Sequence, residues 1–504
     1  MSISMIRAQE PQRVVDAGRT LTEKASALDV LIGEQVRAAN AMRESWFGRA
    51  ATAAAAKAYR NIQQEYLEHE KLAALAAAMR SGGAAMVAIR AVLLAWAGIA
   101  AAMFDVSDAG VVTPRPPNDS APWLAIAAAY TRIIQQLIEQ FLTADETTAN
   151  GIGAITAGWL PQNNPLPGGI DPDSLNNDQL TWLQSLAGSG DPTTGEGGVG
   201  VPNTDLSIMG MTPDGRMFTI QGDTGVGIGE TGGPGPRAEA GGHNNIIFWK
   251  MDEHGKWVVD EVVNDPFPNT PGDISTIPTS TFNNGDTMYA SVMNVRNWNS
   301  DPAPGEPGWY TRSSELWKST DGGRTWTKAG PSWTNGKGSD DPFQVQSFAP
   351  RNDGYVYMYG SENGRTNDGL HVARVAVGDV EDPEKYQYWN GESFSASQPP
   401  QSSPAILPRP EGYSGVGEPN VHFYDNKALL TFTDDRGNIF TSSSTDGVNW
   451  SPPQLVTSQP GAYGVFQSPL SAGDSVDASI SLWNPYGTQL ISIANSDTKG
   501  LGAY

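Results

Sequence analysis

The hydrophobic periodicity of this chain changes near its middle, and this change constrains the fold more than any single motif. From about residue 8 to residue 145 the sequence is rich in Ala, and its apolar residues recur at the spacing of amphipathic helices. After residue 201 they alternate in short runs separated by Gly, Pro, Asn and Asp, as in short β-strands. The chain, at 504 residues, is also too long for one ordinary domain. The sequence therefore predicts a multidomain protein, with an α-helical hairpin or bundle at 1–150, a Gly/Pro-rich linker at 151–200 and an all-β domain at 201–504.

The helical half divides further at its glycines and prolines. One helix is expected to end near Ser45, and a second to run from Ala50 to Arg80 and stop at Gly82 and Gly83. The stretch 84–104 is apolar enough to suggest a membrane span, but Arg90 interrupts it, so we expect a buried bundle helix and no stable transmembrane anchor. A helix at 123–142, after a Pro-rich hinge, would complete a four-helix arrangement.

Charge and composition exclude several classes of partner and site. The chain has 55 acidic and 32 basic residues, which argues against binding to nucleic acid or to an anionic membrane surface. It has no Cys, and its five His offer no ligand pair at a useful spacing, so we expect no metal and no cofactor. Residues 1–12 have no apolar core of a secretory signal peptide. We therefore expect a secreted or cell-surface protein to be exported without a cleavable signal peptide.

A short motif in the helical half suggests such a route. The turn Trp46-Phe47-Gly48, followed by Tyr66 and Glu70 on the next helix, resembles the WxG-type substrates of type VII secretion. In that family the Trp-x-Gly turn joins two helices, and a Tyr-x-x-x-Asp/Glu signal usually lies just past the second helix, whereas here it falls inside the predicted helix. The resemblance implies a WxG-type partner protein or a secretion chaperone. The simpler alternative is that Trp46 is a core aromatic and that Tyr66 and Glu70 form a solvated face.

Two internal repeats indicate the architecture of the β half. The segments Ser319-Thr-Asp-Gly-Gly-Arg-Thr-Trp326 and Ser443-Ser-Thr-Asp-Gly-Val-Asn-Trp450 resemble the Asp-box turns of sialidase-like β-propellers, and 251–257 is a degenerate third copy. In such turns the Asp binds the turn backbone, Gly takes positive φ and Trp packs between sheets. The resemblance implies a structural role, away from the active face. About 300 residues with some twenty short strands fit a five-bladed propeller.

Two carboxylates bracket the first hairpin of this half. Asp205 comes just before one predicted strand and Asp223 just after the next, with the turn Thr212-Pro-Asp-Gly215 between the strands. Because a hairpin returns the chain to its starting point, both acids should lie at the same end of the sheet. Paired carboxylates are what a glycosidase requires. The alternative is that both residues only terminate strands and cap turns.

The β half as a whole resembles the actinobacterial endo-D-arabinanases of glycoside hydrolase family 183, formerly DUF4185. The resemblance covers residues 200–504 and lies in Thr204 to Thr224, Gly241 to Asn245, the Asp boxes and Gly417-Glu-Pro-Asn420. It implies a five-bladed propeller, catalytic Asp205 and Asp223, an inverting outcome, and α-linked D-arabinofuranose in mycobacterial arabinogalactan and lipoarabinomannan as substrate. Such a reaction needs no cofactor. Between the two acids, we lean to Asp205 as base and Asp223 as acid.

Loops at the same face supply candidates for sugar binding. The substrate-binding residues that we expect are His243, Asn244, Arg296, Trp298, Gln346, Glu362, Glu418, Asn420 and Tyr463. Trp298 reads as an exposed loop aromatic that could stack on a sugar, and Glu418 as a third acid that tunes the pair. The run Gly227-Ile-Gly-Glu-Thr-Gly232 matches a nucleotide-loop pattern, but Pro234 follows where a helix should begin, so a loop over a cleft is favoured.

Two other functions remain open at this point. A sialidase-like hydrolase would need an arginine trio for the substrate carboxylate, and no Arg-Ile-Pro motif opens the β half. A non-catalytic glycan-binding or adhesion propeller would bind sugar without turnover, and its binding would not depend on either acid.

Overall fold

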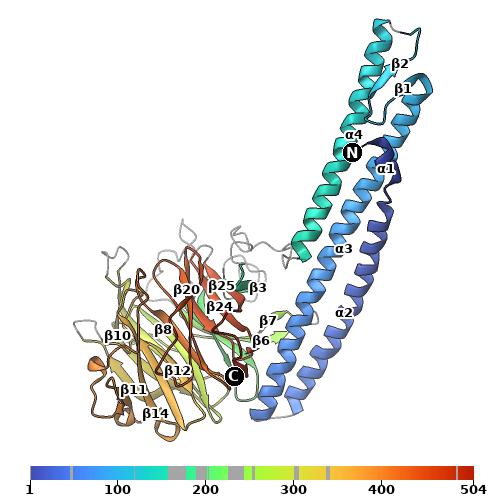
Figure 1. Cartoon of the computed structure of the whole chain (residues 1–504). Helices are drawn as coiled ribbons and strands as arrows, with labels where there is room; N and C mark the ends of the chain where they lie inside the picture. Colours follow the sequence, from blue (N-terminus) through green and yellow to red (C-terminus); the bar gives the residue numbers. More distant parts are fainter. Residues whose placement is uncertain are drawn as a thin grey trace. The chain divides into compact units, whose positions relative to one another are not determined.

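The computed structural model describes residues 2–45, 49–118, 120–156, 177–188, 201, 204–224, 243–252, 256–299, 306–336, 341–483 and 486–503. The chain forms two compact units, one of Met1–Gln35 with Ile62–Asn163 and one of Val36–Asn61 with Asn164–Tyr504. Three long helices dominate the first unit and a five-bladed β-propeller forms the bulk of the second, which confirms the predicted fold class (Figure 1).

The helical unit packs its helices around one apolar core. Its elements are α1 (Ile3–Ala8), α2 (Gln12–Ser45), α3 (Arg49–Met103), the short strands β1 (Phe104–Val106) and β2 (Val112–Pro114), and α4 (Ala121–Thr156). The strands β1 and β2 pair antiparallel and join α3 to α4. The core is built from apolar side chains that recur at helical spacing, including Ile6, Leu93, Ala97, Ala100, Phe104, Ile134, Ile138 and Phe141.

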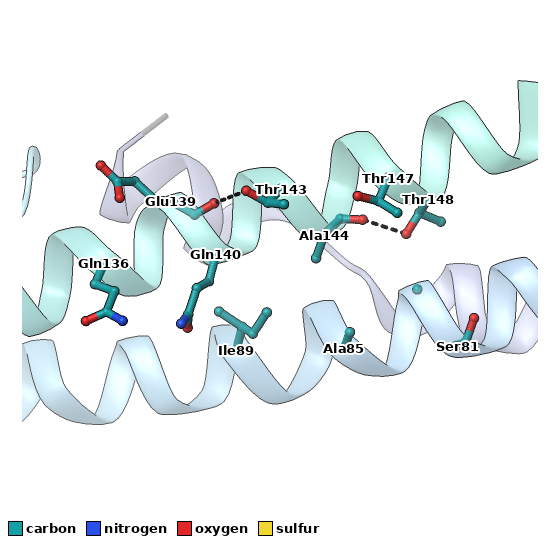
Figure 2. Close-up of a pocket in the computed structure, with 11 residues that line it drawn as sticks. Ser81, Ala85, Ile89, Gln136, Glu139, Gln140, Thr143, Ala144, Thr147 and Thr148 are labelled. Carbon is teal, nitrogen blue, oxygen red and sulfur yellow. Dashed lines mark hydrogen bonds between the residues drawn. The ribbon is translucent and has the colours of Figure 1, made fainter.

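The second predicted helix does not end at Gly82 and Gly83, because α3 runs through both residues to Met103. These glycines instead let neighbouring helices approach closely. A Cβ at Gly82 would lie 1.9 Å from Oγ1 of Thr148 on α4, and one at Gly83 would lie 2.8 Å from Val15 on α2. Beside Gly82, α3 and α4 leave a groove of about 650 Å³ lined by Ser81, Gln140 and Thr147 among others (Figure 2). The predicted four-helix arrangement is thus three long helices and the short α1.

The apolar part of α3 is only partly buried. Its stretch Glu68–Met103 is long and apolar enough to cross a membrane, a test that core helices of other proteins also pass. One face contributes Leu93 to the core, whereas Val92 and Ile99 are exposed. Arg90 is accommodated because its guanidinium donates hydrogen bonds to the carbonyl oxygens of Ile6 (3.1 Å) and Arg7 (2.6 Å).

Two of the four residues in the predicted secretion motif, Trp46 and Gly48, lie outside the described residues. Tyr66 and Glu70 are half-buried on α3, one helical turn apart. The Tyr66 ring stacks on His69 with centroids 6.3 Å apart, and Nδ1 of His69 lies 3.4 Å from a Glu70 carboxylate oxygen.

Each propeller blade is an antiparallel sheet, and in blades one to four the strands follow one another in the chain. Blade one is β4 (Asp205–Met211), β5 (Met217–Thr224), β6 (His243–Met251) and β7 (Trp257–Asn264); blade two is β8 (Ser275–Asn284), β9 (Thr287–Trp298), β10 (Trp309–Ser319) and β11 (Thr327–Thr334). Blade three is β12 (Val345–Pro350), β13 (Tyr355–Ser361), β14 (Gly369–Ala376), β15 (Gln387–Trp389) and β16 (Phe394–Ser395), with β17 (Leu407–Pro408) paired to β14. Blade four is β18 (Gly417–Phe423), β19 (Ala428–Thr433), β20 (Asn438–Ser444) and β21 (Gln454–Ser458).

The fifth blade closes the ring with a strand from the other end of the domain. It orders β22 (Ala462–Gln467), β24 (Val476–Leu482), β25 (Gly487–Ile493) and β3 (Leu180–Gly188), while β23 (Ala472–Gly473) pairs with β26 (Gly502–Ala503). The strand β3 lies within the segment predicted as a linker, so the propeller begins before residue 201. Because β3 precedes blade one in the chain and completes blade five, it ties the two ends of the ring together.

The first strands of the blades line the central axis. Neighbours in the series β4, β8, β12, β18 and β22 contact each other, and β22 returns to β4. Apolar clusters fill the spaces between blades, such as Ile208, Phe218, Phe248, Met288 and Val292 between blades one and two. Both faces of most inner strands therefore pack against other strands, which explains the nearly continuous burial of β4, β12 and β18.

Both predicted Asp boxes form tight turns. Asp321 accepts hydrogen bonds from the backbone N–H groups of Arg324 (3.1 Å) and Thr325 (2.9 Å), and Trp326 is buried in the core between blades one and two. Asp446 accepts from the N–H groups of Val448 (2.8 Å) and Asn449 (2.7 Å).

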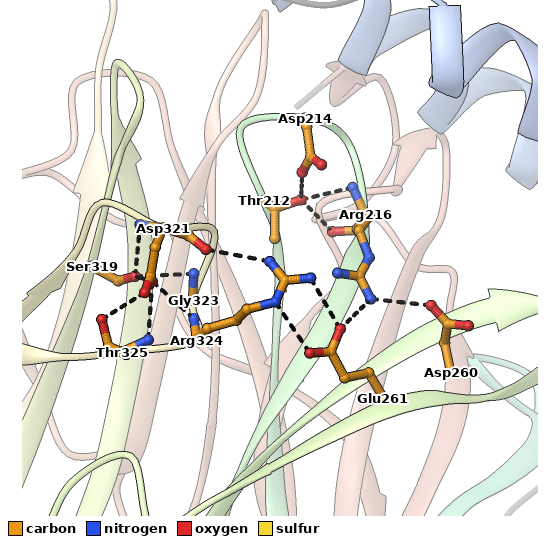
Figure 3. A network of polar contacts seen from close by, with 10 residues as sticks. All are labelled: Thr212, Asp214, Arg216, Asp260, Glu261, Ser319, Asp321, Gly323, Arg324 and Thr325. Atoms are coloured by element: carbon orange, nitrogen blue, oxygen red, sulfur yellow. Dashed lines mark hydrogen bonds and ion pairs between the residues drawn. The ribbon is translucent and has the colours of Figure 1, made fainter.

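The first Asp box also links two blades at the end of the propeller away from the acid pair. The Arg324 guanidinium donates to both oxygens of Glu261 in β7 (3.2 and 3.1 Å), and Arg216 donates to the same carboxylate (3.0 Å) (Figure 3). Arg216 belongs to the turn between β4 and β5, whereas Asp205 and Asp223 lie at the opposite end of that hairpin. The Asp box therefore stabilises the scaffold and takes no part in the site described below.

Replacing Asp321 by Ala is expected to lower the free energy of unfolding by about 1 kcal/mol at neutral pH, since the turn loses its hydrogen-bond acceptor. Burial raises the pKa of Asp321, but hydrogen bonds from Thr325, Ser319 and Arg324 outweigh it and lower the pKa to about 2. The stabilisation by the Asp321 carboxylate is therefore complete above the pKa of this group in the unfolded chain, near 4, and is lost as the pH falls towards 2. The difference in melting temperature between wild type and Asp321→Ala should shrink as the pH is lowered from 7 to 3. The control Glu392→Ala, on an exposed turn, should differ little from wild type at any pH.

Candidate active site

One end of the central channel gathers polar side chains from several blades. Asp205 and Ser275 begin the inner strands β4 and β8, and Glu418 and Tyr463 are the second residues of β18 and β22. Because each blade begins with its inner strand, these residues come to the same end of the ring. Direct contacts agree: Tyr463 Oη donates to Oδ2 of Asp205 (3.0 Å), and Ser275 Oγ donates to Oδ1 of Asp223 (2.8 Å).

The two predicted acids lie side by side in blade one. Asp205 is directly opposite Gly222 in the β4–β5 ladder, and Asp223 is the next residue along β5. Their exposed fractions are only 7% and 6%. A Cβ at position 222 would lie 2.8 Å from Oδ1 of Asp205, so the glycine makes room for the carboxylate. The hairpin thus brings the two acids to the same end of the sheet, as its sequence predicted, and both are buried there.

A β-bulge aims Asp205. The register of β4 shifts between Asp205 and Ile208, and Leu206 and Ser207 have positive φ values of 68° and 52°. Blade five holds this irregular backbone: the Leu206 N–H donates to Ser481 Oγ (2.8 Å), and Ser479 Oγ donates to the Ser207 carbonyl oxygen (2.7 Å). Bulges commonly redirect a side chain next to an active site.

Backbone strain is concentrated at the same place. Asp223 and Glu418 also have positive φ, at 35° and 40°, in a region that residues other than Gly rarely adopt. With Leu206 and Ser207, these are four of the five residues with such backbone among the described residues that are not Gly. Strain that persists at clustered polar residues points to function, because folding stability alone would select against it.

The environment keeps a proton on the acid pair near neutral pH. Burial, and next the carboxylate of Asp223, raise the pKa of Asp205, while Tyr463, Tyr486 and Arg365 lower it; the balance is a pKa of about 7. Oδ1 of Asp205 is buried and accepts no aligned hydrogen bond from the described residues, so no donor there opposes its protonation. Burial and the nearby Asp205 raise the pKa of both Tyr463 and Tyr486 well above the usual value, so both hydroxyls remain donors.

A buried ion pair borders the acids. Arg365, in the loop after β13, donates from Nε to Oε2 of Glu418 (2.8 Å) and forms a second hydrogen bond to Oε1. Thr433 Oγ1 donates to the same Oε2 (3.2 Å). The guanidinium carbon of Arg365 lies 4.7 Å from the ring centroid of Tyr463 and 4.9 Å from that of Trp309. Arg365 therefore places one positive charge between Glu418 and Asp205 and fixes the ring that binds Asp205.

The predicted sugar-binding residues are placed in two groups. Tyr463 and Glu418 belong to the acid cluster, and Glu418 acts on it through Arg365. Arg296 lies half-buried on β9, Glu362 lies half-buried directly after β13, and His243 begins β6 with a side chain outside the described residues.

The other predicted residues form hydrogen bonds or ring contacts within the propeller, whereas we expected them on exposed loops. The Asn244 amide spans the Phe267 and Thr276 carbonyl oxygens (2.8 and 3.1 Å), and Gln346 bonds the Phe343 carbonyl oxygen (2.8 Å). Asn420 accepts from the Gln467 N–H (2.8 Å). Trp298 is not in a loop: it ends β9 opposite Trp309, and the two rings meet edge to face at 6.4 Å.

Four residues of the site carried no signal that the sequence analysis detected. Ser275, Trp309, Arg365 and Tyr486 come from blades two, three and five, and each stands in a sequence context that does not differ from ordinary loops and strand ends. Only closure of the ring brings them to Asp205 and Asp223.

Comparisons with known proteins give one family and a set of related folds. A family model described as "Domain of unknown function (DUF4185)" matches residues 191–492. Among solved structures, the chain is similar to a family 117 glycoside hydrolase of the marine bacterium Zobellia galactanivorans, with 11% identity, 64% of this chain and 91% of that chain covered, and a TM-score of 0.40. It is also similar to a GH43 endo-arabinanase from Bacillus licheniformis, with 13% identity, 57% and 93% covered, and a TM-score of 0.33. No curated protein matches the sequence.

Proposed function

The chain belongs to the DUF4185 family, and from this premise we propose that its propeller is an endo-acting glycoside hydrolase that cleaves α-D-arabinofuranosidic bonds of mycobacterial-type arabinan. The observation that carries the proposal is the buried pair Asp205 and Asp223, in which burial and the second carboxylate raise the pKa of Asp205 to about 7. Glycoside hydrolysis requires two carboxyl groups of which one holds a proton near neutral pH. The resemblance of residues 200–504 to endo-D-arabinanases supports the choice of arabinogalactan and lipoarabinomannan as substrates.

The raised pKa supports the reverse of the acid and base roles that the sequence favoured. In this proposal Asp205 is the general acid, and it donates its carboxyl proton to the oxygen of the leaving sugar. Asp223, which accepts a hydrogen bond from Ser275, is the carboxylate that takes a proton from the attacking water. The C–O bond to the leaving sugar breaks as the water oxygen bonds to the anomeric carbon. Tyr463 and Tyr486 then stabilise Asp205 after it has given up its proton.

This assignment implies inversion at the anomeric carbon, in agreement with the family resemblance. A direct attack by water leaves no covalent sugar–enzyme intermediate and changes the anomeric configuration in one step. Proton NMR of the first products, recorded before mutarotation, reads this configuration.

The test is digestion of mycobacterial arabinogalactan by the full chain, with released oligosaccharides separated by chromatography. We expect a ladder of oligoarabinosides from early times, as for internal cleavage, and no products from a linear xylan. Arabinogalactan that stays intact while the protein still binds it would contradict the enzyme proposal and favour the non-catalytic glycan-binding propeller.

For the helical unit we propose a role in export through type VII secretion, with a WxG-type protein or a secretion chaperone as partner. Support comes from the Trp46-Phe47-Gly48 sequence and from the spacing of Tyr66 and Glu70 by one turn of α3. The protein would then act at the cell surface or outside the cell, where arabinan is found.

A further inference from the structure

We infer that a second pocket on the propeller, formed by the loops 409–414 and 435–436 together with Thr366, binds uncharged sugar residues of the substrate at a distance from the bond that is cleaved. We call it the loop pocket. Its volume is about 610 Å³, within the range of ligand pockets in general. The inference rests on the proposed function, since it assigns this pocket to the same polysaccharide.

The loop pocket opens at the end of blade four that holds Glu418. One of its walls is the loop that leads into β18, and the other is the turn between β19 and β20. Gly417 at the start of β18 is directly opposite Thr433 at the end of β19, and Thr433 bonds Glu418. The Asp446 turn, by contrast, follows β20 at the far end of the blade. The pocket and the acid cluster therefore share one face of the propeller.

One chain segment connects the pocket to the acid cluster. Thr366, which lines the pocket, directly follows Arg365, whose guanidinium contacts Glu418 and the Tyr463 ring. The loop of the pocket packs tightly on this segment, because a Cβ at Gly415 would lie only 2.6 Å from the Arg365 carbonyl oxygen. A glycan that extends from the acids over Arg365 would therefore meet the loop pocket next.

The charges of the pocket favour a neutral ligand. Arg409 and Arg436 line it together with Glu411 and Asp435, so positive and negative side chains are equal in number. The Asp435 carboxylate already accepts a hydrogen bond from Ser414 Oγ, and its Oδ1 lies 4.0 Å from Nε of Arg436. Guanidinium and carboxylate groups can each bind neighbouring hydroxyls of a sugar. An anionic ligand would be repelled by the two carboxylates of the pocket, and a cationic ligand by its two guanidinium groups.

Polar and aromatic groups in the pocket are available to such a ligand. Thr366 Oγ1 is buried and has no hydrogen-bond partner among the described residues. Arg409 forms no ion pair with any residue that the structure describes. Burying a hydroxyl without a partner is unfavourable, and a sugar hydroxyl would supply the missing hydrogen bond. Tyr413 is half-buried and is held edge to face on Phe440 at 4.8 Å, so it offers a fixed ring for stacking on a sugar.

The test compares oligoarabinofuranosides of increasing length. In the full chain carrying Asp205→Asn, which should bind without cleaving, isothermal titration calorimetry measures the Kd of each length. Adding Tyr413→Ala is expected to raise the Kd of long oligosaccharides about tenfold more than the Kd of short ones. Arg409→Ala, which changes an exposed side chain, should raise the Kd values in the same pattern. Tyr355→Ala on blade three removes a half-buried tyrosine outside the pocket and should not change the dependence on length.

The outcomes separate this inference from the proposed function. If the wild-type chain cleaves arabinan but Tyr413→Ala and Arg409→Ala weaken all lengths equally or not at all, the loop pocket is not a sugar site. If the wild-type chain cleaves nothing, the proposed function fails whatever the calorimetry shows. Thermal unfolding of Tyr413→Ala checks that this variant remains folded. If Tyr413→Ala is unfolded, the binding data of Arg409→Ala, whose side chain is exposed, test the inference instead.

Discussion

Replacing Asp205 by Asn is expected to lower kcat on arabinogalactan on the order of a thousandfold, because an amide cannot give a proton to the leaving sugar. Asp223→Asn should cause a loss of similar size, since the amide cannot take the proton of the attacking water. Both variants keep the volume of the side chain inside a buried site where both carboxyl groups are less than a tenth exposed. Release of reducing ends from arabinogalactan, measured over hours at saturating substrate, reads the loss.

Stability at two pH values is the control for this experiment. The folded-state pKa of Asp205, about 7, is far above the unfolded value near 4, so the folded protein binds the extra proton. The stabilisation that comes from binding this proton is complete below pH 4 and is lost as the pH rises through 7. At pH 8, Asp205→Asn should therefore unfold at a higher temperature than wild type, and this advantage should shrink towards pH 4. An inactive variant that is less stable at pH 8 would indicate damage to the site and not loss of an acid.

The acid pair was predictable from the sequence because its geometry is local. Asp205 and Asp223 lie on the paired strands of one hairpin, at the end away from its turn, so the hairpin alone brings them together, although the bulge after Asp205 sets their exact register. The Asp boxes were predictable for the same reason, since each turn is built from its own residues. Arg365 could not be found in this way, because its contact with Glu418 depends on how blades three and four close around the axis.

Three of the predicted sugar-binding residues are buried amides with partners inside the propeller. Asn244, Gln346 and Asn420 are predicted as sugar ligands because they were expected on loops at the same face as the acid pair. In the structure all three are less than 5% exposed, and each forms a hydrogen bond to a strand of a neighbouring blade, at Thr276, Ser291 and Gln467 respectively. The inner strands of a propeller place polar side chains around a central channel, and their hydrogen bonds join one blade to the next. The sequence of a single strand does not distinguish this role from binding.

Long-range packing also explains the two differences in secondary structure. Gly82 and Gly83 resemble a helix end, but the close approach of Thr148 and Val15 requires residues without a side chain at both positions. The strand β3 lies in a region rich in turn-forming residues, and it forms only because β25 offers an unpaired edge. In both cases a partner distant in the chain decides the structure.

Glu418→Gln is expected to change the pH dependence of the enzyme and its stability together. Arg365 shares its positive charge between Glu418, to which it is paired, and Asp205, whose pKa it lowers. Without the Glu418 charge, Arg365 should act more strongly on Asp205 and lower the pKa of this acid. The alkaline limb of kcat/KM reports the acid in the free enzyme, so it should move to lower pH. The loss of the charged partner of Arg365, whose side chain is 24% exposed, should also lower the free energy of unfolding by about 2 kcal/mol.

Arg365→Gln provides the matched comparison, because it removes the other half of the same pair. Asp205 then loses a nearby positive charge, so its pKa should rise and the alkaline limb of kcat/KM should move to higher pH. Both variants are expected to be less stable, and a merely structural role would therefore shift their pH profiles alike or not at all. Opposite displacements from the two substitutions require that the charge of Arg365 reaches Asp205 and that Glu418 controls how much of it does. Displacements in the same direction would contradict this coupling and leave Arg365 and Glu418 as a structural ion pair.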